Sequence, residues 1–334
     1  MPIPLISTMI WITERFNEYL KIAYLGLDRN RYPGNTNLKQ LRKTFRYSSY
    51  WLSPPPGETE SNWLGHYKDV QSADLGFLVL YAATDVEDPT FTGNSYEQGK
   101  ADAETAKNIA INEGFPTGTI IYLDIERGGA MTFDKQLPYL TGWLDQMATS
   151  PYKAGVYCSG IPDDEGIITA EFIKNSFSDR DITCWVYDDR CPLVGHLPGC
   201  QFPKSAPWPH DWNKESIVNV AVWQYAQSPR RVKECADSKD KGSEDFAKDC
   251  SNYFSNEGIK DPLGCYCFPP GFEDGSKLDS DGAKMYVDVN TATSPDPSHG
   301  RKYTIKKVSP RVSLALVVFL LGIGYWFYKT SKSF

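Results

Sequence analysis

Short apolar runs alternate with helix-like patterns from residue 22 to residue 290, and this alternation constrains the fold more than any other feature. Alternation of this kind is typical of βα units, in which helical crossovers join parallel strands. Eight strands with mostly helical connections favour a closed barrel over an open sheet, so we predict an α/β fold, a (β/α)8 TIM barrel. The eight runs are residues 22–28, 47–52, 75–82, 119–126, 153–158, 182–187, 217–225 and 284–290.

Helical spacing is clearest in residues 94–113, where alanine recurs and where Gly114 ends the pattern. Residues 133–147 give a second amphipathic helix. After the sixth strand the regular pattern fails, because residues 188–213 are rich in Pro, Cys and Trp. Residues 228–283 then form a charged, Cys-containing insertion between strands seven and eight.

Composition divides the 334-residue chain into four parts. Residues 1–21 are an N-terminal segment, and residues 22–292 fill one barrel, which routinely needs 250 residues or more. Residues 293–311 are polar and basic and are predicted to be a linker. Residues 312–328 contain no charged side chain and end in aromatic residues, so they predict a C-terminal transmembrane helix with membrane lipid as a partner.

The side of the membrane on which the barrel lies is left open by two opposing signals. More Lys and Arg precede residues 312–328 than follow them, which by the positive-inside rule favours a cytoplasmic barrel. The cysteine content favours an oxidising compartment. The localisation that we expect is a single-pass protein anchored at its C-terminus, with the barrel outside the cytoplasm.

Eight cysteines are many for a cytosolic enzyme. Cys158 and Cys184 lie in apolar runs, which indicates buried thiols or a bridge between neighbouring strands. His196 and His210 lie near two other cysteines, but their spacing matches no established zinc pattern, so we expect no metal and no cofactor. The remaining cysteines lie in loop-like sequence and favour disulfides; they are Cys191, Cys200, Cys235, Cys250, Cys265 and Cys267.

The net charge of −7 argues against nucleic acid as a partner, because nucleic-acid-binding proteins gather Lys and Arg on one face. The body of the chain has no basic stripe. A basic cluster does precede the apolar tail, where anionic lipid headgroups are the expected partner.

Acidic residues stand at the ends of three predicted strands, where barrel enzymes carry their catalytic groups. Asp28 follows the first strand, Asp124 and Glu126 lie in the fourth, and Asp288 lies in the eighth. Because Asp124 and Glu126 are two residues apart, the pleat points both to one side. Carboxylates among Ile, Tyr and Leu are costly unless they are paired or perform a task.

Glycosidic hydrolysis needs this arrangement of acids. One carboxyl group must be protonated so that it can donate its proton to the leaving oxygen. A second must be ionised so that it can stabilise the developing oxocarbenium charge, attack the oxocarbenium carbon or activate a water molecule. Glu126 is the candidate general acid, because its longer side chain ends the strand, and Asp124 is its charged partner. The alternative is that Asp-x-Glu merely ends a strand and caps the next turn.

Four segments occur in the order and at the strand positions of glycoside hydrolase family 25, the muramidase lysozymes, which the chain therefore resembles. The chain is more similar still to a bacterial family described as glycoside hydrolase-like and related to family 25. Its shared pieces include residues 27–34, 114–118, 121–126 and 155–159. The four segments of family 25 are Gly26-Leu27-Asp28, Asp124-Ile125-Glu126, Trp223-Gln224-Tyr225 and Val287-Asp288-Val289-Asn290.

The resemblance implies a role for each matching position. Glu126 is implied as the proton donor and Asp124 as the assisting carboxylate, in an enzyme acting on an amino-sugar polysaccharide such as peptidoglycan. Stereochemical outcome depends on carboxyl separation, so inversion and retention both stay open. The implied substrate-binding residues are Asp28, Asp288, Tyr81, Trp185, Trp223 and Gln224, with barrel packing as the alternative for both tryptophans.

Two further hypotheses stay open beside the hydrolase. A carbohydrate-binding protein without turnover, or a structural surface protein, would use the same barrel. The long insertion favours these alternatives, and so do Arg29 and Arg127, because a guanidinium next to an acid lowers the pKa of that acid. The presence of all four acids favours the enzyme.

Overall fold

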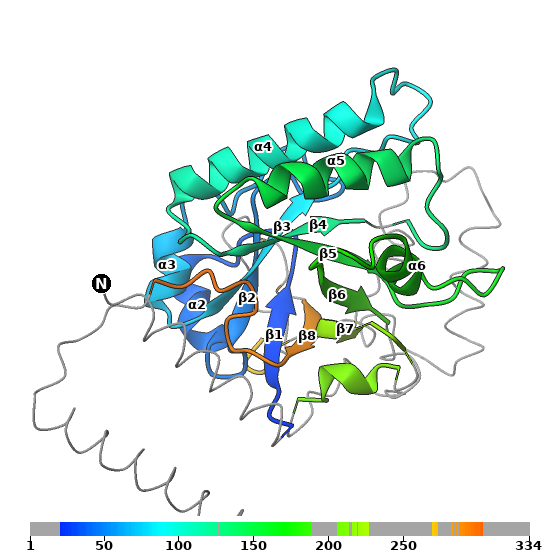
Figure 1. The fold of residues 1–334 in the computed structure, drawn as a ribbon. Helices are drawn as coiled ribbons and strands as arrows, with labels where there is room; N and C mark the ends of the chain where they lie inside the picture. Colours follow the sequence, from blue (N-terminus) through cyan, green and yellow to red (C-terminus); the bar gives the residue numbers. More distant parts are fainter. Residues whose placement is uncertain are drawn as a thin grey trace, which may run out of the picture. The chain divides into compact units, whose positions relative to one another are not determined.

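The computed structural model shows a closed barrel of eight strands in the order β1 to β8 (Figure 1). It describes residues 21–125, 127–188, 206–213, 216–218, 220–226, 269–272, 282, 285 and 287–302. The strands are β1 (Tyr24–Asp28), β2 (Tyr47–Trp51), β3 (Gly76–Ala82), β4 (Ile120–Asp124), β5 (Lys153–Ser159), β6 (Thr183–Tyr187), β7 (Val220–Ala226) and β8 (Asp288–Ala292).

Helices connect the first six strands one by one. These helices are α2 (Asn35–Leu41), α3 (Tyr67–Ser72), α4 (Ser95–Glu113), α5 (Gln136–Ala148) and α6 (Thr169–Ser176). Between β6 and β7 the described residues contain a 3-10 turn, η1 (Pro209–Asp211). The predicted strand runs therefore match the eight observed strands in number and order.

The predicted (β/α)8 fold is wrong in two respects. β8 runs antiparallel to both of its neighbours, β7 and β1, whereas a (β/α)8 barrel is parallel throughout. In the described part of the chain, α-helices connect strands only as far as β6. An antiparallel strand needs no helical crossover to enter the sheet, and a pattern of apolar residues carries no information on strand direction.

The prediction of a C-terminal transmembrane anchor is likewise withdrawn. No helix among the described residues has the length and apolarity needed to cross a bilayer. The segment expected to do so, residues 312–328, lies outside the described residues. The membrane-anchored localisation and the membrane-lipid partner depended on that helix, so both predictions lose their support.

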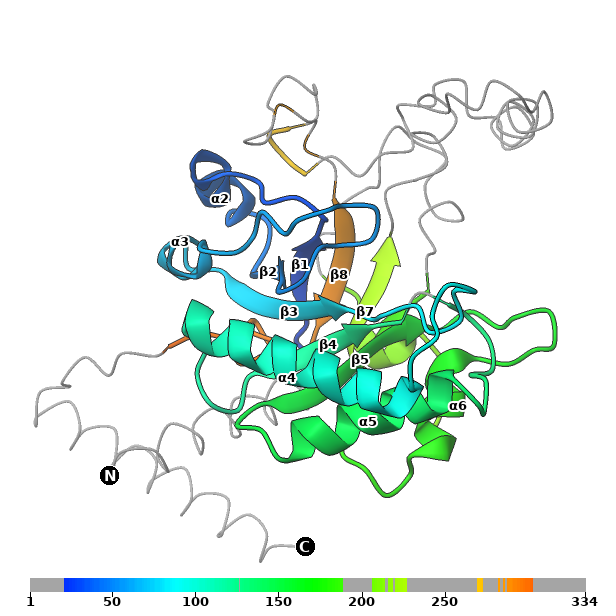
Figure 2. The ribbon, with the colours of Figure 1, turned by 90° about the horizontal axis from the view of Figure 1, so that it is seen from above.

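α4 and α5 lie side by side against the barrel, as both ribbon views show (Figures 1 and 2). Their backbones touch, because a Cβ added at Gly99 would lie 2.0 Å from the Tyr139 carbonyl oxygen. A Cβ at Gly142 would lie 2.0 Å from the carbonyl oxygen of Tyr96. Contact this close fixes the two helices relative to each other.

Residues 293–302, which composition assigns to the linker, lie against the beginnings of β3 and β4. The Asp296 carboxylate accepts hydrogen bonds from the backbone N–H groups of Phe77, Gly300 and Arg301. Ser298 accepts a hydrogen bond from the Val79 N–H through its hydroxyl, and one from the Ile120 N–H through its carbonyl. This segment therefore satisfies backbone groups at the amino end of the barrel.

Candidate functional site

Two contacts of Trp185 identify the barrel interior. The Trp185 ring on β6 meets the Tyr122 ring on β4, although β5 lies between these strands. The Trp185 indole N–H donates to the Asn290 side-chain oxygen on β8, across β7, at 3.0 Å. Side chains of strands that are not neighbours can meet in this way only inside the barrel. Because side chains alternate between the two faces of a strand, the other strand residues are assigned to the interior or the exterior by counting from Tyr122, Trp185 and Asn290.

Four polar side chains face this interior at the end where the parallel strands finish. Asp124 lies two residues after Tyr122, and Gln224 lies directly opposite Asn290 in the β7–β8 register. Asp28 and Asp288 are partners in the β1–β8 register, and Asp288 lies two residues before Asn290. Three of these, Asp28, Asp124 and Gln224, are at most 7% exposed.

One of the acids is oriented by an amide from the neighbouring strand. The Gln224 side-chain N–H group donates to Asp288 Oδ2 at 2.9 Å. Gln224 therefore fixes Asp288 as an acceptor at the rim of the interior.

Aromatic side chains form a floor below the acids. Tyr47, Tyr122 and Trp185 are fully buried, and the Trp185 ring lies 4.5 Å from the Tyr157 ring. Burial raises the pKa of the Tyr47 and Tyr122 hydroxyl groups well above the usual value, so both stay protonated.

Several polar atoms of this interior have no hydrogen-bond partner among the described residues. They are Tyr47 OH, Tyr122 OH, Trp51 Nε1, Gln224 Oε1 and Asn290 Nδ2. Buried polar groups in native proteins are nearly always satisfied by protein, water or a ligand. Partners for these groups are therefore expected from bound water, a ligand or the rest of the chain.

Two predicted substrate-binding residues lie on the opposite face of their strands. The Tyr81 ring contacts Trp143 of α5, and burial together with the nearby Asp102 raises its pKa to about 12. Trp223 alternates with Gln224, and its indole N–H donates to the Asp188 carbonyl oxygen. Neither side chain joins the acids in the interior. Trp185 does join them, as part of the floor.

The candidate proton donor, Glu126, lies outside the described residues. The two arginines that follow acids in the sequence have other contacts. Arg127 Nη1 lies 3.7 Å from Glu87 Oε2, and its side chain is 64% exposed. The buried Arg29 donates to Met285 Sδ, and its backbone N–H donates to Ser49.

Sequence reasoning missed the tyrosine layer and the role of Asn290. Counting back two residues from Asp124 gives Tyr122, and counting forward two from Asp288 gives Asn290. The same period-2 rule that paired Asp124 with Glu126 would therefore have found both.

Cys158 and Cys184 are free, buried thiols, so the alternative of a bridge between strands is wrong. Burial raises the pKa of both thiols, that of Cys184 to about 12, so they are unreactive packing residues. The six loop cysteines lie outside the described residues, so the disulfide prediction has no support there. Within the described ranges, no group of three His, Cys, Asp or Glu residues is arranged to hold a metal ion.

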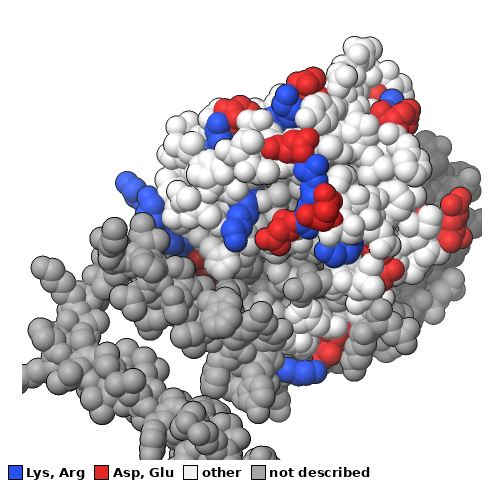
Figure 3. Space-filling view, in the orientation of Figure 1, with Lys and Arg blue, Asp and Glu red and all other residues white. Residues whose placement is uncertain are grey.

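The face of the molecule seen in Figure 3 carries Lys and Arg interspersed with Asp and Glu. This face therefore has a mixed charge pattern. Ion pairs among the described residues include Arg180 with Asp145 at 2.6 Å and Arg42 with Asp74 at 2.7 Å.

A family model described as the Rv2525c-like, glycoside hydrolase-like domain matches residues 57–248. No curated protein matches the chain.

Among solved structures, a Bacillus stearothermophilus protein is 18% identical, with 62% of this chain and 91% of that chain covered and a TM-score of 0.43. The Tat-secreted protein Rv2525c of Mycobacterium tuberculosis is 14% identical, with 60% and 87% covered and a TM-score of 0.38. A family 25 glycosyl hydrolase from Bacillus anthracis is 9% identical, with 80% and 88% covered and a TM-score of 0.39.

Proposed function

Because the chain belongs to the Rv2525c-like, glycoside hydrolase-like family, we propose that it hydrolyses an amino-sugar polysaccharide of the peptidoglycan type. The observation that carries the proposal is the set of interior side chains at the carboxyl end of the strands. Three carboxylates and an amide (Asp28, Asp124, Asp288 and Gln224) face one interior above a floor of aromatic rings.

The proposed chemistry divides the work between two carboxyl groups. Glu126 donates a proton to the leaving glycosidic oxygen, and Asp124 stabilises the positive charge that develops at the sugar ring. Glu126 is assigned this role from its position two residues after Asp124 and from the family resemblance. Asp124, at 4% exposure, is shielded from water, which strengthens its electrostatic effect on a developing cation.

The remaining interior residues bind substrate in this proposal. Asp288, held by Gln224, accepts hydrogen bonds from sugar hydroxyl or acetamido N–H groups. Asp28 lies opposite Asp288 and serves the same purpose from β1.

The test is the release of reducing ends from purified peptidoglycan and from chitin-like polymer. We expect turnover by the wild type and its loss in Glu126→Gln and in Asp124→Asn. Asp179→Asn is the matched control, because it removes an exposed carboxylate after α6, at the opposite end of the barrel. Unchanged turnover in Glu126→Gln would overturn the assignment of the proton donor.

The same assay separates the alternatives. Absence of turnover with retained sugar binding would select a carbohydrate-binding barrel without catalysis. Absence of both would select the structural role and end the hydrolase proposal.

A further inference from the structure

A second site candidate lies at the N-terminal ends of α4 and α5, outside the barrel. A cavity of about 480 Å³ opens there, within the range of small-molecule sites. Because α4 follows β3 and α5 follows β4, these helix ends lie at the same end of the barrel as Asp124. The cavity is lined by residues 91–96 together with Asp134, Lys135 and Pro138.

The lining combines aromatic and hydrogen-bonding side chains. Phe91, Tyr96 and Pro138 provide apolar surface, while Asn94, Asp134 and Lys135 provide polar groups. A pyranose ring presents an apolar face and a rim of hydroxyl groups, so it needs both kinds of surface. A site for an anion alone would not need three apolar side chains.

The walls of the cavity are held in place before any ligand arrives. The backbone contacts at Gly99 and Gly142 lock α4 against α5. Tyr96 is fixed further, because its hydroxyl donates to Asp145 Oδ2 at 2.9 Å. Asn94 caps α4 by accepting from the Glu97 N–H. A rigid site loses less entropy on binding.

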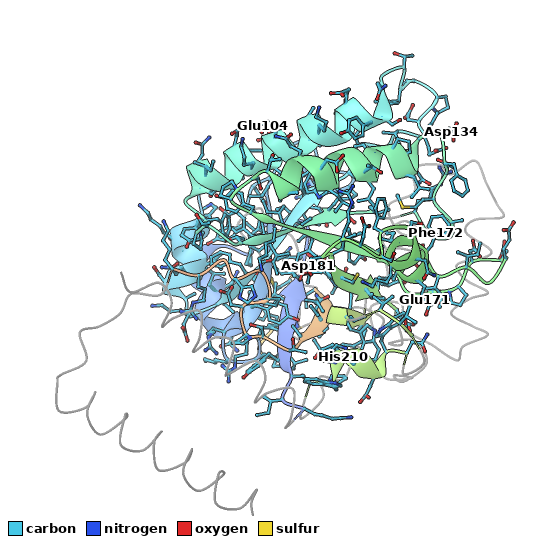
Figure 4. The ribbon with its side chains drawn as sticks, viewed as in Figure 1. Glu104, Asp134, Glu171, Phe172, Asp181 and His210 are labelled. Atoms are coloured by element: carbon cyan, nitrogen blue, oxygen red, sulfur yellow. The ribbon has the colours of Figure 1, made fainter. Side chains whose placement is uncertain are left out.

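An exposed aromatic residue is adjacent in sequence to one of the residues that line the cavity. Phe133, which directly precedes Asp134, is 83% exposed, the largest exposure among the large apolar side chains of the described residues. Its ring lies 6.5 Å from the ring of Phe172 on α6. Figure 4 shows Asp134 in the loop before α5 and Phe172 on α6, on the same side of the molecule. Phe133 therefore extends the aromatic surface from the cavity toward α6.

We propose that this cavity, with Phe91 and Phe133, binds an amino-sugar unit of the same polysaccharide at a distance from the cleaved bond. The inference rests on the proposed function for the identity of the ligand. A polymer that enters the barrel extends beyond it, and further binding surface at the same end of the barrel increases the affinity for the chain.

The experiment is a titration of wild type and variants with a tetramer of β-1,4-linked N-acetylglucosamine, followed by calorimetry and by NMR. In the full chain, Phe91→Ala and Phe133→Ala are each expected to weaken binding about tenfold, since each removes the apolar surface under one sugar ring. Ile111→Ala is the control, because Ile111 is also exposed but lies near the other end of α4. Unchanged affinity in both Phe variants would overturn the proposal.

A second measurement separates this inference from the proposed function. On polymer, Phe91→Ala and Phe133→Ala are expected to raise KM about tenfold with kcat unchanged, because the cavity does not touch the reacting bond. Tetramer binding that is lost in Asp124→Asn and unaffected in the Phe variants would place all binding in the barrel and refute the cavity. Binding that depends on Phe91 in a protein without any turnover would retain the cavity and refute the hydrolase.

Discussion

Each end of the barrel holds a hydrogen-bonded carboxylate, and the partners of these two carboxylates differ. At the amino end, the Asp296 carboxylate accepts three hydrogen bonds, from the backbone N–H groups of Phe77, Gly300 and Arg301. At the carboxyl end, Asp288 accepts from the side chain of Gln224. Asp296 therefore ties the segment after β8 to β3, whereas Asp288 is positioned at the rim of the barrel interior by a side chain from β7.

The difference follows from how a barrel is built. At the amino end the strands begin with N–H groups that need acceptors, and residues 293–302 supply them. At the carboxyl end the interior is lined with polar side chains above the Trp185 floor. The backbone contacts that anchor the chain therefore lie at the amino end of the barrel, and the proposed site lies at the opposite, carboxyl end.

The largest expected effect is at the carboxyl end. Asp124→Asn should lower the rate of glycan hydrolysis about 1,000-fold, because it removes the charge that stabilises the developing cation. It should lower the free energy of unfolding by less than Asp296→Ala does, because asparagine has the size of aspartate and can still accept a hydrogen bond. Rate assays and urea denaturation of the same variant measure both. A large loss of stability in Asp124→Asn would show that Asp124, like Asp296, has a structural role, and it would contradict the contrast between the two ends.

At the amino end, Asp296→Ala should lower the free energy of unfolding by about 3 kcal/mol, because three buried N–H groups lose their acceptor. Urea denaturation measures this effect. Asp179→Ala is the control and should change stability by less than about 0.5 kcal/mol. A loss in Asp296→Ala no larger than that of the control would contradict the structural role.

The floor between the two ends should show an intermediate effect. Trp185→Phe keeps an aromatic ring but leaves Asn290 Oδ1 without its donor, at a cost of about 2 kcal/mol. Thermal unfolding measures the loss. Cys184→Ala serves as the comparison on the same strand, because Cys184 directly precedes Trp185 and therefore lies on the outward face of β6. If Trp185→Phe left the thermal stability unchanged, the hydrogen bond from the indole N–H to Asn290 would not contribute to stability.

The pH dependence of stability should reveal the burial of Asp296. Burial raises the pKa of Asp296 above 3.8, although the backbone N–H groups oppose the shift. Between the unfolded and the raised folded pKa, the native state binds the extra proton, so the contribution of Asp296 to stability falls as pH rises. The slope is at most about 1.4 kcal/mol per pH unit. Asp296→Asn should abolish it, as denaturation across the acidic range would show.

The smallest effect is expected at the rim. Arg127→Gln should change the free energy of unfolding by less than about 0.5 kcal/mol, because the pair with Glu87 is long and its arginine is 64% exposed. Chemical denaturation measures it. A loss above 1 kcal/mol would show that Arg127 contributes to the barrel end more than its contact with Glu87 implies.

Much of the site was predictable from alternation. The acids Asp28, Asp124 and Asp288 stand out because each interrupts a run of apolar residues. Their common face was established only by the strand register and the contacts of Trp185. Tyr81 was harder, since both faces of a barrel strand are buried and both are apolar. Its contact with Trp143 of α5 became evident only from the packed helices.

The number and order of the strands were determined by the sequence alone, because each strand needs a local apolar run that no neighbour can supply. The direction of β8, the backbone contact of α4 with α5 and the attachment of residues 293–302 were decided by tertiary structure. These features depend on residues far apart in the chain, such as Phe77 and Asp296, whose pairing no local pattern encodes.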